Sequence, residues 1–153
     1  MQALAWKFHV GLYRTTIVHK IIHETSKALW DVLKVNYLKT PETEADWLSI
    51  NQDFYTRWNF PHCLGSIDGK HITIQAPAKS GSLYYNYKKT FSVVLMASCD
   101  SQYKFTTVDI GAYGSQSDGG VFRLSVFGQK IDENEANIQS DSLLPGTNTT
   151  MPL

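Results

Sequence analysis

The hydrophobic pattern of this chain changes from helical to strand periodicity near residue 60, and this change limits the possible folds more than any other feature. Before this point, apolar residues recur every three or four positions, as in amphipathic helices. From residue 64 to residue 76, LGSIDGKHITIQA alternates as strands do, and Gly69 directly after Asp68 predicts a tight bend between two of them. We therefore predict an α+β (α/β) chain in which helices precede a sheet.

Two long helices are expected before the change of pattern. Apolar residues at helical spacing predict the first over residues 13–37. Thr43 and Asp46 form a capping pair that predicts the second, ending near Trp58. The expected buried residues of the first helix are Val18, Ile21, Ile22, Thr25, Leu29, Val32 and Leu33, and those of the second are Trp47, Leu48, Phe54, Tyr55 and Trp58.

The N-terminal segment has the partial outline of a helix-turn-helix, a DNA-reading motif. A short helical stretch over residues 2–9 and a turn at Gly11 precede the long helix. Residues near the start of the second helix of such motifs contact bases. The DNA-contacting candidates are therefore Arg14, Thr15, Thr16, His19 and Lys20. The same outline fits a helical hairpin that only packs on the next domain.

Three strands are expected after residue 60, with Asp68 at the end of a central one. Residues 91–98 are apolar and residues 104–110 alternate, so the short connection 100–102 predicts an antiparallel pair. The loop 77–90 places lysines among tyrosines, which suits contact with a phosphate backbone and equally suits a solvated, tyrosine-rich loop. Its DNA-contacting candidates are Lys79, Lys88 and Lys89.

A glycine-rich stretch, GAYGSQSDGGVFRLS, follows the strands at residues 111–125. Ser117 or Asp118 can cap a helix that begins near Gly119 and runs through Leu124. From residue 128 onward the periodicity is lost, and the pattern predicts a polar surface loop.

Composition leaves most function classes open. Fourteen Lys and Arg balance fourteen Asp and Glu, so any nucleic-acid surface must be local. Cys63 and Cys99 are too few for a disulfide scaffold, and both are predicted to be reduced core residues. No apolar run approaches the roughly 18 residues of a membrane span, so we expect no membrane partner.

The aspartates allow one specific chemistry. Two Mg²⁺ or Mn²⁺ ions about 4 Å apart, held by several acidic groups, can stabilise both the attacking and the leaving oxygen of a phosphodiester. Asp68 on a strand and Asp118 at the head of a helix over the same sheet are a credible pair of ligands. On the residues alone, an ordinary turn residue and a helix cap also explain the two aspartates.

Three stretches resemble the PIF/Harbinger class of DDE transposases and the nuclease domesticated from that class. They are RWNFPHCLGSIDGKHITIQAP (57–77), YYNYKKTFSVVLMASCD (84–100) and GAYGSQSDGGVFRLS (111–125), in order and with natural spacing. The N-terminal LAWKFHVGLYRTTIVHKIIHET resembles the helix-turn-helix segment of the same family.

The resemblance implies a helical segment over residues 1–58 and an incomplete RNase H-like nuclease domain over residues 59–153. It implies that Asp68, in the IDG motif, is catalytic and a metal ligand, and that Asp118, in the GSxxD motif, is a further ligand for Mg²⁺ or Mn²⁺. Tyr113 replaces the proline that often precedes the glycine of GSxxD. The next aspartate and the catalytic glutamate of the family would both fall after the last residue of this sequence.

The expected function is that of a transposase-derived, divalent-metal-dependent DNA endonuclease, inactive as this fragment because later acids are missing. DNA is the implied partner, with a separate DNA-binding protein as a second one, and the nucleus is the implied location, alone or together with the cytoplasm. The alternative is a catalytically dead DNA-binding or protein-interaction module. The third alternative is that the chain is a fragment that does not fold stably.

Overall fold

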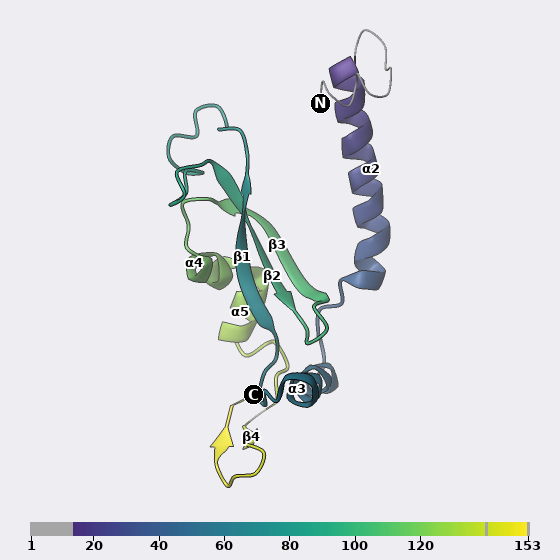
Figure 1. Ribbon diagram of the computed structural model, residues 1–153, viewed down its shortest axis with the longest axis vertical. Helices are drawn as coiled ribbons and strands as arrows, with labels where there is room; N and C mark the ends of the chain where they lie inside the picture. Colours follow the sequence, from purple (N-terminus) through teal and green to yellow (C-terminus); the bar gives the residue numbers. More distant parts are fainter. Residues whose placement is uncertain (1–13, 140, 153) are drawn as a thin grey trace. The chain divides into compact units, whose positions relative to one another are not determined.

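The computed structural model describes residues 14–139 and 141–152, and its elements carry the labels of Figure 1. The chain divides into two compact units, Met1–Tyr37 and Leu38–Leu153. The helices are α2 (Arg14–Tyr37), α3 (Glu44–Trp58), α4 (Asp118–Leu124) and α5 (Val126–Asp132), and the strands are β1 (Ser66–Thr73), β2 (Ser92–Cys99), β3 (Phe105–Tyr113), β4 (Ser142–Leu143) and β5 (Thr150–Met151). Helices combined with an antiparallel sheet confirm the predicted α+β class and agree with a partial RNase H-like domain.

Helix α2 belongs to the first unit, and its bounds agree with the helix predicted over 13–37. The predicted burial of its apolar stripe is wrong at most positions. Val18 is buried, whereas Leu29 and Val32 are 54% and 66% exposed. A single helix cannot cover its own stripe, and the first unit contains no other described element. Neither α2 nor any other helix in the described part of the chain is long and apolar enough to cross a membrane.

Helix α3 begins with the capping box that the sequence predicts. The Thr43 hydroxyl oxygen accepts a hydrogen bond from the Asp46 N–H at 3.2 Å, and the Asp46 carboxylate accepts one from the Thr43 N–H at 3.0 Å. A further bond from the Thr43 hydroxyl and the bonds from the Thr43 and Glu42 N–H groups lower the pKa of Asp46.

The tryptophans of α3 connect it to the second unit. The Trp47 indole N–H donates to the Ala136 carbonyl oxygen at 2.7 Å, and the Trp58 N–H donates to the Ser101 carbonyl oxygen at 3.0 Å. Of the residues expected in the core, Trp47 and Phe54 are buried, and Leu48, Tyr55 and Trp58 are exposed. Helix α3 therefore belongs to the second compact unit, while the predicted domain division after residue 58 stays a prediction.

Strands β1, β2 and β3 form an antiparallel sheet in that order, so β2 is central and β1 lies at an edge. Two predictions are wrong here. Strand β1 runs without a bend through Gly69, and Asp68 is the third residue of an edge strand, not the end of a central one. The predicted antiparallel pairing of β2 with β3 is confirmed.

Helix α4 packs on β2, and α4 and α5 lie on one side of the sheet (Figure 1). The core between them consists of Val94, Met96 and Val121, with Ala112 and Phe122 packed against it. Residues paired across antiparallel strands share a face, and Gly69 pairs with Met96. Gly69 therefore lies on the face of the sheet that the helices cover. The side chain of Asp68, one position earlier, points to the opposite face.

Residues after 125 form more structure than the predicted polar loop. Ser125 caps α5 by accepting a hydrogen bond from the Gly128 N–H at 3.0 Å, and β4 pairs with β5. His62 holds this hairpin to the segment before β1, since its Nδ1 lies 3.0 Å from the Pro152 carbonyl oxygen. Elements of seven and two residues are too short to show a periodicity, so the sequence pattern missed them.

Cys63 and Cys99 are free thiols, as expected, but they are half-buried and lie outside the core. Both line a cavity of about 370 Å³ together with Phe54 and Trp58. Burial raises the pKa of the Cys99 thiol, and the neighbouring Asp100 carboxylate raises it further. Cys99 therefore stays protonated at neutral pH and is a poor nucleophile.

Candidate metal and nucleic-acid site

Asp118 is the first residue of α4 and is exposed. The cap of this helix is Ser117, whose hydroxyl oxygen accepts a hydrogen bond from the Gly120 N–H at 3.3 Å. Of the two caps that the sequence allows, the structure therefore selects Ser117. The Asp118 carboxylate is not used for capping.

The Asp118 carboxylate packs directly against Gly69 of β1. A Cβ atom at position 69 would lie 2.1 Å from Asp118 Oδ1 and 2.6 Å from its Cγ. The carboxylate thus fills the space that any larger residue at position 69 would need. A glycine inside a strand often marks such a close approach, and this explains why β1 does not bend there.

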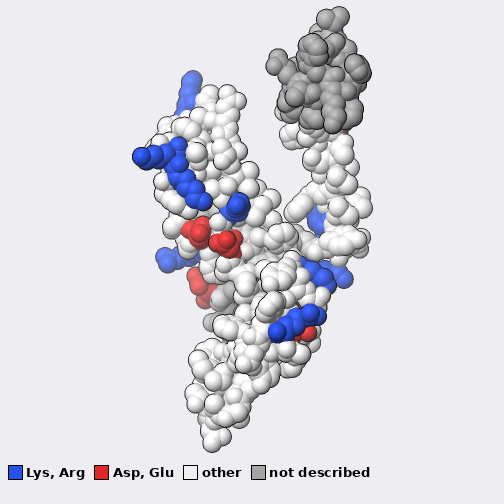
Figure 2. Space-filling view, viewed as in Figure 1, with Lys and Arg blue, Asp and Glu red and all other residues white. Residues whose placement is uncertain are grey.

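Asp68 precedes Gly69 on the strand, so the structure brings the two predicted ligands to neighbouring positions. Asp68 is exposed, and strand alternation directs its side chain to the face opposite Asp118. Because β1 is an edge strand, the two carboxylates border the same outer edge from its two faces. Figure 2 shows acidic side chains close together over β1 and α4. We call Asp68 and Asp118 the acidic pair.

The carboxylate oxygens of the acidic pair are the type of ligand that Mg²⁺ and Mn²⁺ prefer. A two-ion site for phosphodiester chemistry needs further donors. Within residues 14–139 and 141–152, no group of three or more His, Cys, Asp or Glu could hold a metal ion. Asp68 and Asp118 alone are too few for such a site.

Asp109 lies on the helix-covered face of the sheet, a point that its sequence pattern leaves open. It pairs with Met96, which in turn pairs with Gly69, so these three residues share one face. Two strand spacings, about 10 Å in total, separate the backbones of Asp109 and Gly69. Asp109 is a neighbour of the acidic pair and not a member of it.

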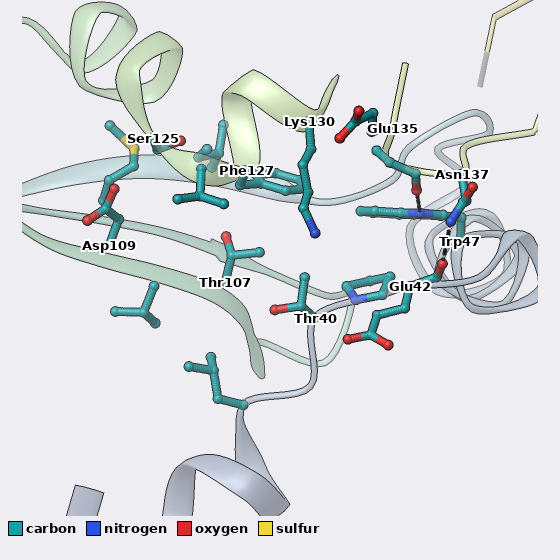
Figure 3. Close-up of a pocket in the computed structure, with 17 residues that line it drawn as sticks. Thr40, Glu42, Trp47, Thr107, Asp109, Ser125, Phe127, Lys130, Glu135 and Asn137 are labelled. Atoms are coloured by element: carbon teal, nitrogen blue, oxygen red, sulfur yellow. Dashed lines mark hydrogen bonds between the residues drawn. The ribbon is translucent and has the colours of Figure 1, made fainter. Parts of the chain in front are cut away.

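A cavity of about 730 Å³ lies on the same face (Figure 3). Trp47 lines it from α3, Asp109 from β3, and Phe127 and Lys130 from α5. Neither residue of the acidic pair contributes to its lining. Its walls mix aromatic rings with charges of both signs, so its chemistry does not indicate a phosphate site.

The lysines of loop 77–90 are exposed, and they occupy two separate turns. Lys88 and Lys89 lie at the tip of one turn, and Lys79 lies in another at the start of the loop. The Lys88 ammonium stands 5.3 Å from the centre of the Tyr87 ring. Figure 2 shows basic side chains over this loop, next to the acidic side chains over β1 and α4. A local group of basic side chains therefore lies next to the acidic pair.

The comparison with known families adds the deciding observation. The family described as DDE superfamily endonuclease matches residues 67–151, more than half of the chain, and this match includes the acidic pair. The chain belongs to this family. The resemblance that the sequence motifs indicate is thereby confirmed.

Relatives within the DDE superfamily endonuclease family are much longer than this chain. The human protein named "Putative nuclease HARBI1" is 28% identical over 110 residues, 72% of this chain and 31% of that protein, and the rat protein of the same name matches to the same extent. "Protein ALP1-like" from Arabidopsis thaliana is 32% identical over 88 residues, 56% of this chain and 22% of that protein. The chain therefore spans less than a third of these relatives. No solved structure matches it.

The DNA-contacting candidates on α2 belong to the first compact unit of this family member, whereas the acidic pair belongs to the second. The side chains of Arg14 and Thr15 and the short helix expected over residues 2–9 lie outside the described residues. The candidates Thr16, His19 and Lys20 are exposed. Lys20 pairs with Glu24 on the next turn at 3.7 Å, in solvent. The helix-turn-helix thus stays a prediction.

A hydrogen-bonded network links Asn86 of the basic loop to Ser92 of β2 and His71 of β1, and the sequence pattern did not predict it. Asn86 Nδ2 donates to the Ser92 hydroxyl oxygen at 2.8 Å, and that oxygen lies 2.9 Å from His71 Nδ1. Asn at the start of a tight turn is a recognisable signal, because its side chain bonds to the backbone a few residues on. Nothing in the periodicity indicates that this turn meets His71.

Proposed function

We propose that the chain forms part of the active site of a transposase-derived, divalent-metal-dependent DNA endonuclease. The observation that carries this proposal is the packing of the Asp118 carboxylate against Gly69, beside Asp68. Two exposed carboxylates at one strand edge begin a ligand set for Mg²⁺ or Mn²⁺. Membership of the DDE superfamily endonuclease family supports phosphodiester hydrolysis as the reaction.

A bound divalent ion would polarise the phosphodiester and help to activate the attacking water. Asp68 would be the catalytic first ligand, and its backbone is fixed because β1 pairs with β2 from Ser66 to Thr73. Asp118 is positioned by the packing of Val121 on Val94. Asp68 lies on a strand and Asp118 on a helix, and such elements fix the positions of side chains more accurately than loops do.

DNA is the substrate that the charges around the acidic pair favour. Lys88 and Lys89 can neutralise phosphates of a strand that passes the pair, a contact that gives affinity without sequence selection. We therefore assign the choice of target sequence to a separate DNA-binding partner protein or to α2. A DNA substrate also makes the nucleus the proposed location.

Mn²⁺-dependent nicking of supercoiled plasmid DNA tests the proposed function. Two carboxylates are fewer than a complete two-ion site needs, so we expect the chain to give at most trace nicking. This trace should disappear in Asp68→Asn and in Asp118→Asn and persist in Asp132→Asn, an exposed control at the end of α5. Nicking that survives in both single variants of the acidic pair would refute the site. Rapid turnover that Asp68→Asn abolishes would show that the ligand set is complete.

A second function, DNA or protein binding without cleavage, is favoured by the small ligand set among the described residues. Its signature is DNA binding that survives in the Asp68→Asn, Asp118→Asn double variant. Replacing Lys88 or Lys89 with Ala should lower the slope of binding against salt by about 1, and Lys104→Ala, on the hairpin between β2 and β3, should not. Loss of binding in Arg14→Ala or Lys20→Ala would instead locate the DNA contact on α2.

A further inference from the structure

The His71 side chain is held by a buried chain of hydrogen bonds. Its Nδ1 lies 2.9 Å from the Ser92 hydroxyl oxygen, and that oxygen accepts a hydrogen bond from Asn86 Nδ2 at 2.8 Å. Ser92 and Asn86 are 0% and 3% exposed. Water therefore cannot complete a bond that the protein leaves open at this point.

Asn86 sets the direction of the whole chain of bonds. Its Oδ1 accepts from the Lys88 N–H, the Thr90 N–H and the Thr90 hydroxyl, at 3.0, 3.1 and 3.2 Å. These donors fix the amide oxygen on the turn side, so the Asn86 NH₂ group must face Ser92.

The direction of the bonds then determines the tautomer of His71. The Ser92 oxygen already accepts from Asn86, so its single hydrogen is available for His71 Nδ1. The reverse arrangement, with Nδ1–H donating, would leave the buried Ser92 hydrogen without an acceptor, which costs free energy. With Nδ1 accepting, the neutral imidazole carries its proton on Nε2.

An aromatic ring packs on the imidazole, and a basic group packs on that ring. The Tyr87 ring meets it edge to face, with centroids 5.4 Å apart and an interplanar angle of 72°. The Lys88 ammonium lies 5.3 Å from the centre of the same Tyr87 ring, which is itself 79% exposed. We call His71, Tyr87 and Lys88 the His71 cluster. It combines a fixed N–H donor, a cation and an open ring.

The His71 cluster lies on the same face of β1 as the Asp118 carboxylate. Gly69, which Asp118 contacts, and His71 are two residues apart, so they share a face and lie about 6.6 Å apart along the strand. A DNA strand that follows β1 would therefore pass both the acidic pair and His71.

We propose that the His71 cluster binds the DNA strand that flanks the phosphodiester at the acidic pair. His71 Nε2–H donates to a phosphate oxygen, Lys88 supplies positive charge, and Tyr87 stacks on an unpaired base. Ser92 and Asn86 are positioning residues that fix the donor. This inference rests on the proposed function, since it takes the acidic pair as the place where the DNA is cut.

The first test reads the tautomer directly, by long-range ¹H–¹⁵N NMR of the histidine rings in EDTA. We expect Nε2–H for His71 in the free protein and a shift of Nε2 when a short single-stranded DNA is added. Ser92→Ala should remove the tautomer preference while the backbone spectrum stays folded. An Nδ1–H tautomer in the wild-type protein, or a ring unmoved by bound DNA, overturns the inference.

The second test measures binding of a fluorescein-labelled single-stranded DNA in EDTA, where no cutting occurs. His71→Leu should bind about tenfold more weakly, and His71→Gln, whose amide N–H reaches toward the Nε2 position, should restore most of the loss. Tyr87→Ala and Lys88→Ala should also weaken binding. The matched controls are Tyr103→Ala, at 75% exposure, and Lys104→Ala, and both should bind like the wild type.

The outcomes separate this inference from the proposed function. DNA binding that is lost in Lys88→Ala but unchanged in His71→Leu refutes the cluster and leaves the proposed function standing. A wild-type protein that binds no DNA refutes both.

Discussion

The space above Gly69 is filled by the Asp118 carboxylate, and this contact explains the glycine. In the sequence, Asp followed by Gly is also a typical turn signal, so the pattern predicts a bend. A glycine that forms a turn and a glycine that admits a neighbouring side chain look the same in the sequence. Only Asp118, a residue of α4, distinguishes them. The motifs indicate the two aspartates, but they could not predict that the Asp118 carboxylate packs against Gly69.

Asp109 and the network around His71 could also be predicted only in part, because their positions depend on contacts between elements. The face on which Asp109 lies depends on the register of β3 against β2, which includes a shift between Val94 and Leu95. The network of His71, Asn86 and Ser92 depends on how the loop folds back onto the sheet. Periodicity describes one element at a time, so contacts between elements are not encoded in it.

Gly69→Ala should displace the Asp118 carboxylate while the fold stays nearly intact. The new Cβ meets a carboxylate that can rotate away, so we expect the free energy of unfolding to fall by less than about 1 kcal/mol and Mn²⁺ binding to be lost. Urea unfolding and Mn²⁺ titration of the same variant measure both effects.

Gly114→Ala is the contrasting variant. Its Cβ would lie 2.5 Å from the Tyr84 carbonyl oxygen and 2.6 Å from that of Ser92, and backbone atoms cannot move aside so easily. We expect a loss of about 1–3 kcal/mol or more. A larger loss of stability in Gly69→Ala than in Gly114→Ala would contradict this account.

Among the elements, those with strong end signals could be predicted and short ones could not. Thr43 with Asp46 identifies the start of α3, and α2 has nearly the predicted bounds. Helix α5 and strands β4 and β5 have too few residues to show a period. The apolar stripe of α2 indicates a helix correctly but does not say what covers it, because burial depends on a second element.

The capping box of α3 should make stability depend on pH. Hydrogen bonds from Thr43 lower the pKa of Asp46 in the folded state, so the box stabilises the fold above the unfolded pKa of this carboxyl. That stabilisation is lost as the pH falls through the lowered folded pKa. We expect Thr43→Ala to flatten the acid side of the stability curve.

Urea unfolding between roughly pH 7 and pH 2 measures this effect. Ser49→Ala, an exposed change in the middle of the same helix, is the control and should keep the wild-type curve. An unchanged pH dependence in Thr43→Ala would show that the capping box does not contribute.

For the whole molecule, a net charge of zero conceals a local arrangement of charges. Fourteen basic and fourteen acidic residues cancel in the composition, yet basic side chains gather over loop 77–90 and acidic ones over β1 and α4 (Figure 2). The fold creates this arrangement by packing α4 on β2 and by tying the loop to Ser92. Composition could therefore exclude a uniformly basic DNA binder but could not reveal this surface.

Mn²⁺-induced broadening of backbone amide NMR signals tests whether Asp68 and Asp118 each supply a ligand to a divalent cation, as proposed. We expect the signals of Gly69 and Gly119, next to the two aspartates, to broaden at the lowest Mn²⁺ concentration. Asp68→Asn and Asp118→Asn should each remove this selectivity. Broadening that is no stronger there than at exposed acids such as Asp132 and Glu133 would refute the metal site.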